Sequence, residues 1–133
     1  MTNAETVRAM FEAFARRDMA ASAEPLHPDI VWDARQVPVD DIRGVYRGRA
    51  AVAGFWRSWL EAWETVDPGS YDVLEAGDKV FVWLEGQVNR GRVSGIEVQQ
   101  QPYGFVWTFR DGQAVALTLY TDRAEARAAA GLE

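Results

Sequence analysis

The feature that most constrains this chain is an alternation of side-chain types from Val80 to Phe109, broken at the turn sequence Arg90-Gly91-Arg92. Successive side chains of a strand point to opposite faces, so the pattern predicts two long antiparallel strands. In the first, one parity is aliphatic and the other joins aromatic to polar groups: Phe81, Trp83, Glu85, Gln87 and Asn89. The second strand carries a similar mixed set: Glu97, Gln99, Gln101, Tyr103, Phe105, Trp107 and Phe109.

These mixed faces predict the wall of a cavity. A face that is merely solvated does not need Trp83 and Trp107, and a fully packed core does not favour Glu85. Pro102 and Gly104 complicate the alternation, because a proline inside a strand usually marks an edge or a bulge.

The 133 residues suffice for a full hydrophobic core, and we expect a single domain over residues 1–133. The net charge of −6 and the pI near 4.8 argue against nucleic acid and anionic membranes as partners. The sequence has no cysteine, which excludes disulfides and thiolate zinc sites, and its one histidine, His27, does not predict a metal site. We see neither a signal peptide nor an apolar run of membrane-spanning length, so we expect a cytoplasmic protein.

The first half of the chain predicts helices around one strand. Thr2 and Glu5 have the spacing of a capping box for a helix that ends near Arg17, and Asp18 can cap a short helix that stops before Pro25. Further elements follow along the chain: a strand over 29–33, an irregular arm over 35–47 with Pro38, Asp40, Asp41 and a short strand at 45–46, and an apolar-striped helix over 49–64 that includes Trp56, Trp59 and Trp63.

The second half predicts a meander of four antiparallel strands: 71–76, the two long strands, and 113–121. Gly77-Asp78 and Asp111-Gly112 supply tight turns, and Asp122 can cap a last helix that stops at Gly131. Helices followed by a run of strands define an α+β fold, which we expect to be a cone-shaped barrel of a curved antiparallel sheet packed on the N-terminal helices.

Six stretches resemble the SnoaL-like branch of the nuclear transport factor 2-like superfamily: Phe11–Asp18, His27–Asp33, Tyr46–Val52, Ser94–Val98, Val106–Gly112 and Tyr120–Ala126. The resemblance covers nearly the whole chain. It implies an apolar pocket inside the cone and a homodimer formed through the sheet. The superfamily includes ketosteroid isomerases, polyketide cyclases, epoxide hydrolases, dehydratases and non-catalytic binding domains, so the resemblance predicts the fold and leaves the activity open.

The resemblance also tests individual positions. Asp33 falls where the isomerases place their general base, but Met10 and Phe105 occupy the positions of their oxyanion clamp, and neither side chain donates a hydrogen bond. Leu119 stands where the cyclases carry an acid/base aspartate. We therefore expect neither standard reaction.

The remaining candidates combine acid/base groups with ligand contacts. Asp33 and Glu85 could divide acid and base roles if their pKa values are pushed apart, and no metal or organic cofactor is expected. The candidate ligand contacts are Trp56, Trp59, Trp83, Gln87, Gln101, Tyr103, Phe105, Trp107 and Leu119. The function that we predict is binding of a small, largely apolar organic molecule, with isomerase-, dehydratase- or cyclase-like chemistry as an extension. The alternatives are a non-catalytic carrier or sensor, and a dimerisation module whose interior is filled.

Overall fold

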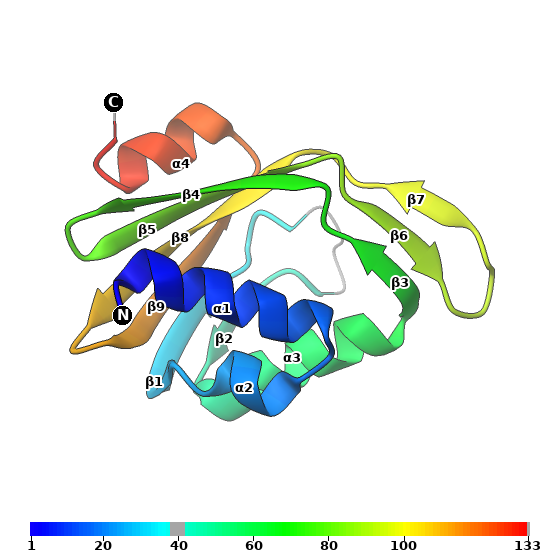
Figure 1. Cartoon of the computed structure of the whole chain (residues 1–133), viewed down its shortest axis with the longest axis horizontal. Helices are drawn as coiled ribbons and strands as arrows, with labels where there is room; N and C mark the ends of the chain where they lie inside the picture. The colour runs from blue at the N-terminus through cyan, green and yellow to red at the C-terminus, as the bar shows by residue number, and fades with distance from the viewer. Residues whose placement is uncertain (38–41, 133) are drawn as a thin grey trace.

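The computed structural model describes residues 1–37 and 42–132 (Figure 1). The described helices are α1 (Asn3–Ala15), α2 (Met19–Ala23), α3 (Arg49–Glu61) and α4 (Arg123–Ala129). The described strands are β1 (Leu26–Asp33), β2 (Val45–Arg47), β3 (Trp63–Asp67), β4 (Ser70–Ala76), β5 (Lys79–Glu85), β6 (Val88–Gly91), β7 (Glu97–Gln99), β8 (Tyr103–Arg110) and β9 (Gln113–Tyr120).

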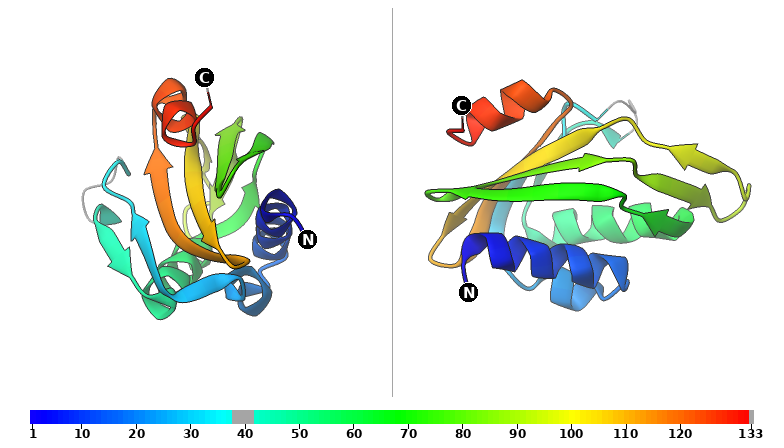
Figure 2. Two further views of the ribbon diagram at one scale, coloured as in Figure 1. Left: turned by 90° about the vertical axis from the view of Figure 1, so that its left-hand side faces the viewer. Right: turned by 45° about the horizontal axis from the view of Figure 1, so that its top comes forward.

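The strands form one large and one small sheet. The large sheet has the order β2-β1-β9-β8-β5-β4, in which the β1–β9 pair is parallel and the other pairs are antiparallel. The small sheet has the order β3-β6-β7 and extends from one end of the molecule. Helices α1, α2 and α3 lie on the concave side of the curved large sheet, and α4 lies on the other side (Figure 2). The predicted α+β cone is confirmed.

The local sequence signals at the helix ends are also confirmed. Thr2 and Glu5 form the reciprocal capping box of α1, and the Asp18 side chain accepts from the backbone N–H of Ala21 at the start of α2. At the start of α4, Asp122 accepts from the backbone N–H of Glu125. Each bond satisfies an N–H group that the helix itself leaves without an acceptor.

Helix α3 is shorter than its apolar stripe predicts, because it ends at Glu61 and Trp63 begins β3. Two arginine side chains bind the carbonyl groups at this end. Arg17 donates to Leu60 O at 3.0 Å and to Trp63 O at 2.8 Å, and Arg92 donates to Glu61 O at 3.0 Å. These bonds satisfy carbonyls that a helix leaves free at its C-terminus. Pro38, Asp40 and Asp41 of the predicted irregular arm lie outside the described part of the chain.

The prediction of two uninterrupted long strands is wrong. The first strand breaks at Gly86, whose φ of +79° favours glycine, and the second is divided between β7 and β8. The turn also lies later than predicted, since Arg90 pairs with Glu97 inside the β6–β7 hairpin.

The break at Gly86 shifts the alternation by one residue. Before it, Val82 and Leu84 belong to the core on the concave side; after it, Gln87 and Asn89 are the buried residues. Phe81 and Trp83 belong to a second cluster on the outer side, where they pack with Ala126 and Ala130 around α4. The single mixed face predicted from Phe81 to Asn89 is therefore divided between two sides of the sheet.

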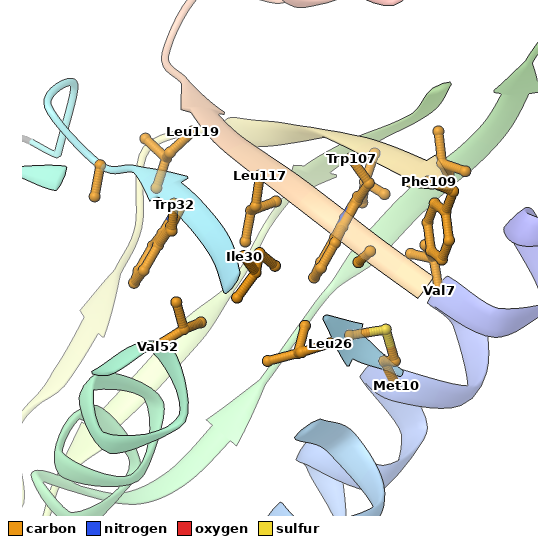
Figure 3. Packing of buried hydrophobic residues seen from close by; sticks show 14 of the residues in the cluster. Val7, Met10, Leu26, Ile30, Trp32, Val52, Trp107, Phe109, Leu117 and Leu119 are labelled. Carbon is orange, nitrogen blue, oxygen red and sulfur yellow. The ribbon is translucent and has the colours of Figure 1, made fainter. Parts of the chain in front are cut away.

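The main core lies between the concave face and the helices (Figure 3). Trp107, Leu117 and Ile30 are almost fully buried in it, and Val7 and Met10 of α1 close one end. None of the described helices is long and apolar enough to cross a membrane.

Gly104 provides a test of the strand register. A Cβ atom added there would lie 2.2 Å from Val82 O and 2.5 Å from the Trp83 ring. We expect Gly104→Ala to destabilise the protein by about 1–3 kcal/mol, the usual range for overpacking. The measurement is urea unfolding followed by circular dichroism.

Gly54→Ala is the matched control, because Gly54 lies within α3 and an added Cβ would meet no atom within 4 Å. This helix substitution should stabilise the protein by about 0.5–1 kcal/mol. Equal effects of the two substitutions would contradict the close approach of β8 to β5.

Candidate functional site

The helices and the concave face enclose a cavity of about 630 Å³. Its walls are mostly apolar, and their aromatic rings come from α1, α3 and several strands: Phe11, Phe14, Trp32, Phe55, Trp56, Trp59, Tyr71, Tyr103, Phe105 and Trp107. These side chains come from distant parts of the sequence because both helices turn an apolar face toward the curved sheet.

Most of the predicted ligand contacts line this cavity. They are Trp56, Trp59, Gln87, Gln101, Tyr103, Phe105, Trp107 and Leu119. The rings contact one another directly: the Trp107 centroid lies 6.2 Å from Trp56 and 6.3 Å from Phe105, and Phe105 lies 5.6 Å from Tyr103. Such tilted and edge-to-face pairs are favourable aromatic geometries and give the wall a defined shape.

Trp83 is the predicted ligand contact that does not reach the cavity. It is 5% exposed and packs in the outer cluster, where its indole N–H donates to Glu85 Oε1 at 3.1 Å. The prediction placed Trp83 on the same face as Gln87, and the phase shift at Gly86 separates them.

Glu85 lies outside the cavity as well. Its side chain is 54% exposed, and its carboxylate lies 3.8 Å from the guanidinium of Arg123 at the start of α4. Both Trp83 and Arg123 therefore hold the Glu85 carboxylate on the outer side of the sheet.

Asp33 is also absent from the cavity lining. Trp32 lines the cavity, so the next side chain of β1 points to the opposite face. Asp33 accepts two hydrogen bonds from the Arg35 guanidinium, at 2.9 Å and 2.7 Å. The side-chain hydrogen bond from Arg35 lowers the pKa of Asp33, which is the opposite of the rise that apolar walls would cause. The structure does not bring Asp33 and Glu85 together at the cavity.

The sequence analysis missed several cavity residues. Phe11 and Phe14 stand in the helical stripe of α1, Trp32 alternates with Asp33, and Tyr71 is the second residue of β4. A signal was present for Phe11 and Phe14, because their helical spacing marks a buried face. It does not indicate whether that face meets a cavity or a packed core.

One chain of polar side chains reaches the cavity. Tyr103 Oη donates to Gln87 Oε1 at 2.8 Å, and Gln87 Nε2 donates to Asn89 Oδ1 at 3.3 Å. Tyr103 and Gln87 line the cavity, and Asn89 lies behind Gln87 and is fully buried. Burial raises the pKa of Tyr103 to about 12, although its hydrogen bond to Gln87 acts in the other direction. Tyr103 is therefore a neutral phenol at physiological pH.

The charged residues of the cavity lining are exposed. They are Glu12, Arg17 and Glu64, at the end of α1 and on β3. The Arg17 guanidinium is engaged by backbone carbonyls, including Glu64 O at 3.0 Å. Within residues 1–37 and 42–132, no cluster of three or more histidine, aspartate or glutamate side chains could hold a metal ion.

The cone fold, its cavity and the sequence together identify the family. A family model for the SnoaL-like domain matches residues 7–117, and the chain belongs to this family. Comparison with curated protein sequences finds no match.

Solved structures agree with this fold. A putative polyketide cyclase from Pseudomonas putida superposes with a TM-score of 0.78 at 20% identity, covering 92% of each chain. TerC, co-crystallised with polyporic acid, superposes with a TM-score of 0.74 at 22% identity, covering 92% of this chain and 93% of its own. An NTF2-like protein of unknown function from Burkholderia pseudomallei is 27% identical over 98% of both chains, with a TM-score of 0.74.

The raised pKa of Tyr103 predicts a loss of stability at high pH. An unfolded tyrosine titrates near pH 10, so the unfolded chain releases this proton first. The contribution of Tyr103 is fully present below about pH 10 and is lost as the pH rises toward about 12. Because the pKa of Tyr103 rises from 10.0 to about 12 on folding, the loss of stability is up to roughly 3 kcal/mol.

Tyr103→Phe should weaken this pH dependence, measured as the free energy of urea unfolding at about pH 9 and about pH 11.5. Tyr120, whose pKa is also raised by burial, remains in both proteins and cancels in the comparison. The same slope in both proteins would contradict a buried neutral phenol at position 103.

Proposed function

We propose that this protein binds a small, largely apolar organic molecule in its aromatic cavity. The observation that carries the proposal is the volume of about 630 Å³ together with its aromatic lining. Small-molecule sites usually measure about 300–1,000 Å³ and combine apolar walls with a few polar groups. The volume counts against a dimerisation module whose interior is filled by its own side chains.

The shape of the lining favours a flat molecule. Trp56 of α3 meets Trp107 of β8 edge-on, Phe14 of α1 packs against Trp59 of α3, and Phe105 of β8 also lines the space. Flat rings can stack on such walls or meet them edge-on, and either contact adds to the free energy of simple burial. TerC, a structural relative with the same fold, was co-crystallised with polyporic acid, which supports an organic ligand here.

Binding without acid/base catalysis fits the cavity better than catalysis does. Met10, Phe105 and Leu119 line the cavity at the positions that the resemblance assigns to acid/base or oxyanion groups. Asp33 and Glu85 point away from it, so their catalytic roles stay predictions that this geometry does not favour. We therefore propose a carrier or sensor of the ligand.

Substitution of one cavity tryptophan tests the proposal. Trp56→Leu should weaken binding of naphthalene, used as a flat apolar probe, by roughly threefold to tenfold. An aromatic contact contributes about 0.5–1.5 kcal/mol beyond simple burial. The measurement is isothermal titration calorimetry.

Trp83→Leu is the control, because Trp83 lies in the outer cluster under α4. Its naphthalene affinity should equal that of the wild type, and circular dichroism verifies that both variants fold. If naphthalene does not bind the wild-type protein, or if both variants lose affinity equally, the cavity is not the binding site.

We also propose a homodimer through the large sheet. Helix α4 covers part of the outer face of the sheet. Ala116 pairs with Val31 on one side and with Thr108 on the other, and residues paired in this way point to the same face, so these three lie in the uncovered part. We expect sedimentation equilibrium to give twice the chain mass of 14.9 kDa, and Ala116→Arg to give the monomer. A monomeric wild type at tens of micromolar would contradict the dimer.

A further inference from the structure

The polar chain Tyr103–Gln87–Asn89 is the most unusual part of the cavity wall. Gln87 is 3% exposed and Asn89 is fully buried, although both carry amide groups. Burying an amide is unfavourable unless it forms hydrogen bonds, and this pair forms them with each other and with Tyr103. This hydrogen-bonded chain therefore places buried polar groups at a defined point of a mostly apolar wall.

The two members of this polar chain that line the cavity, Gln87 and Tyr103, keep a donor and an acceptor that the hydrogen bonds within the chain do not use. Gln87 Nε2 has two protons and donates one of them to Asn89 Oδ1. Tyr103 Oη donates its proton to Gln87 Oε1 and keeps its acceptor capacity. Tyr103 and Gln87 both line the cavity, so a donor and an acceptor stand side by side on its wall.

Resting on the proposed function, we propose that Gln87 and Tyr103 anchor a neutral hydroxyl group carried on a flat aromatic ligand. The hydroxyl oxygen accepts from Gln87 Nε2, and its proton is donated to Tyr103 Oη. A hydroxyl group satisfies both positions at once because it donates and accepts. A ketone oxygen accepts from Gln87 and leaves the Tyr103 acceptor unused.

The hydrogen bonds between Tyr103, Gln87 and Asn89 can also be donated in the opposite direction. If both amides turn over, Asn89 Nδ2, which has no acceptor among the described residues, donates to Gln87, and Gln87 donates to Tyr103. The Tyr103 O–H then points to the ligand. A hydroxyl group fits this arrangement too, since it then accepts from Tyr103.

The surroundings favour a neutral ligand over an ionised one. The charged side chains of the cavity lining, Glu12, Arg17 and Glu64, are exposed, and Arg17 is bound to backbone carbonyls. An ionised ligand group beside Gln87 would lose its water without gaining an opposite charge, which is strongly unfavourable. Burial also keeps Tyr103 in its neutral form.

Calorimetric titration of the full chain with three probes that share one ring system tests the anchor at about pH 7.5: naphthalene, 2-naphthol and 2-naphthoate. We expect 2-naphthol to bind roughly fivefold to tenfold more tightly than naphthalene, as one or two added hydrogen bonds would give. We expect 2-naphthoate to bind more weakly than 2-naphthol.

Gln87→Leu and Tyr103→Phe should each remove most of the preference for 2-naphthol and keep the affinity for naphthalene. Tyr103→Phe deletes a single oxygen, so it tests the anchor even if Gln87→Leu fails to fold. Gln99→Leu, on the exposed strand β7 outside the cavity lining, is the matched control and should keep the preference.

The titrations distinguish a failure of the proposed hydroxyl anchor from a failure of the proposed ligand binding in the cavity. Equal binding of naphthalene and 2-naphthol to the wild type would overturn the anchor and leave the apolar cavity site intact. Tightest binding of 2-naphthoate, or a preference that survives both variants, would also overturn it. If none of the three probes binds, the proposed function fails and the anchor fails with it.

Discussion

The cavity depends on a change of phase in the backbone at Gly86. Alternation along β5 sends Val82 and Leu84 inward and Trp83 outward, and a continuous strand would have sent Gln87 outward too. The positive φ of Gly86 interrupts the strand, after which Gln87 and Asn89 are the buried side chains. The change of phase thus puts the Gln87 amide on the cavity wall, while Glu85, which precedes Gly86, stays outside with its carboxylate beside Arg123.

The same change explains which parts of the fold could be predicted. Helix caps, the tight turns and the alternation within β8 are local signals, and those predictions were confirmed at Thr2, Asp18 and Asp122. Tyr103, Phe105 and Trp107 occupy every second position of β8, so the alternation of side chains along this unbroken strand predicted that all three point into the cavity. Gly86 carries no comparable signal, because a glycine in a strand pattern fits a bulge, a bend or a close contact equally well.

The outer side of the sheet shows why the carboxylates were misplaced. Helix α4 packs on Phe81 and Trp83, and its first residue, Arg123, lies beside Glu85. Arg35 holds Asp33 from the neighbouring loop. Each carboxylate therefore has a cationic partner outside the cavity, and for Asp33 the hydrogen bond from Arg35 lowers the pKa of the carboxyl group. Strand position alone cannot reveal such a partner, because Arg123 lies far from Glu85 in sequence.

Two arginine side chains from distant parts of the sequence meet at the end of α3. Arg17 follows α1 and Arg92 follows β6, and both donate to carbonyls of the segment from Leu60 to Glu64. They join the segments that follow α1 and β6 to the end of α3, the helix that carries Trp56 and Trp59. Hydrogen bonds from a charged guanidinium are stronger than neutral ones, so they help to hold this helix end in place beside the cavity. The cavity of about 630 Å³ leaves apolar side chains uncovered, and the ligand proposed above would gain the burial that the protein's own packing does not supply.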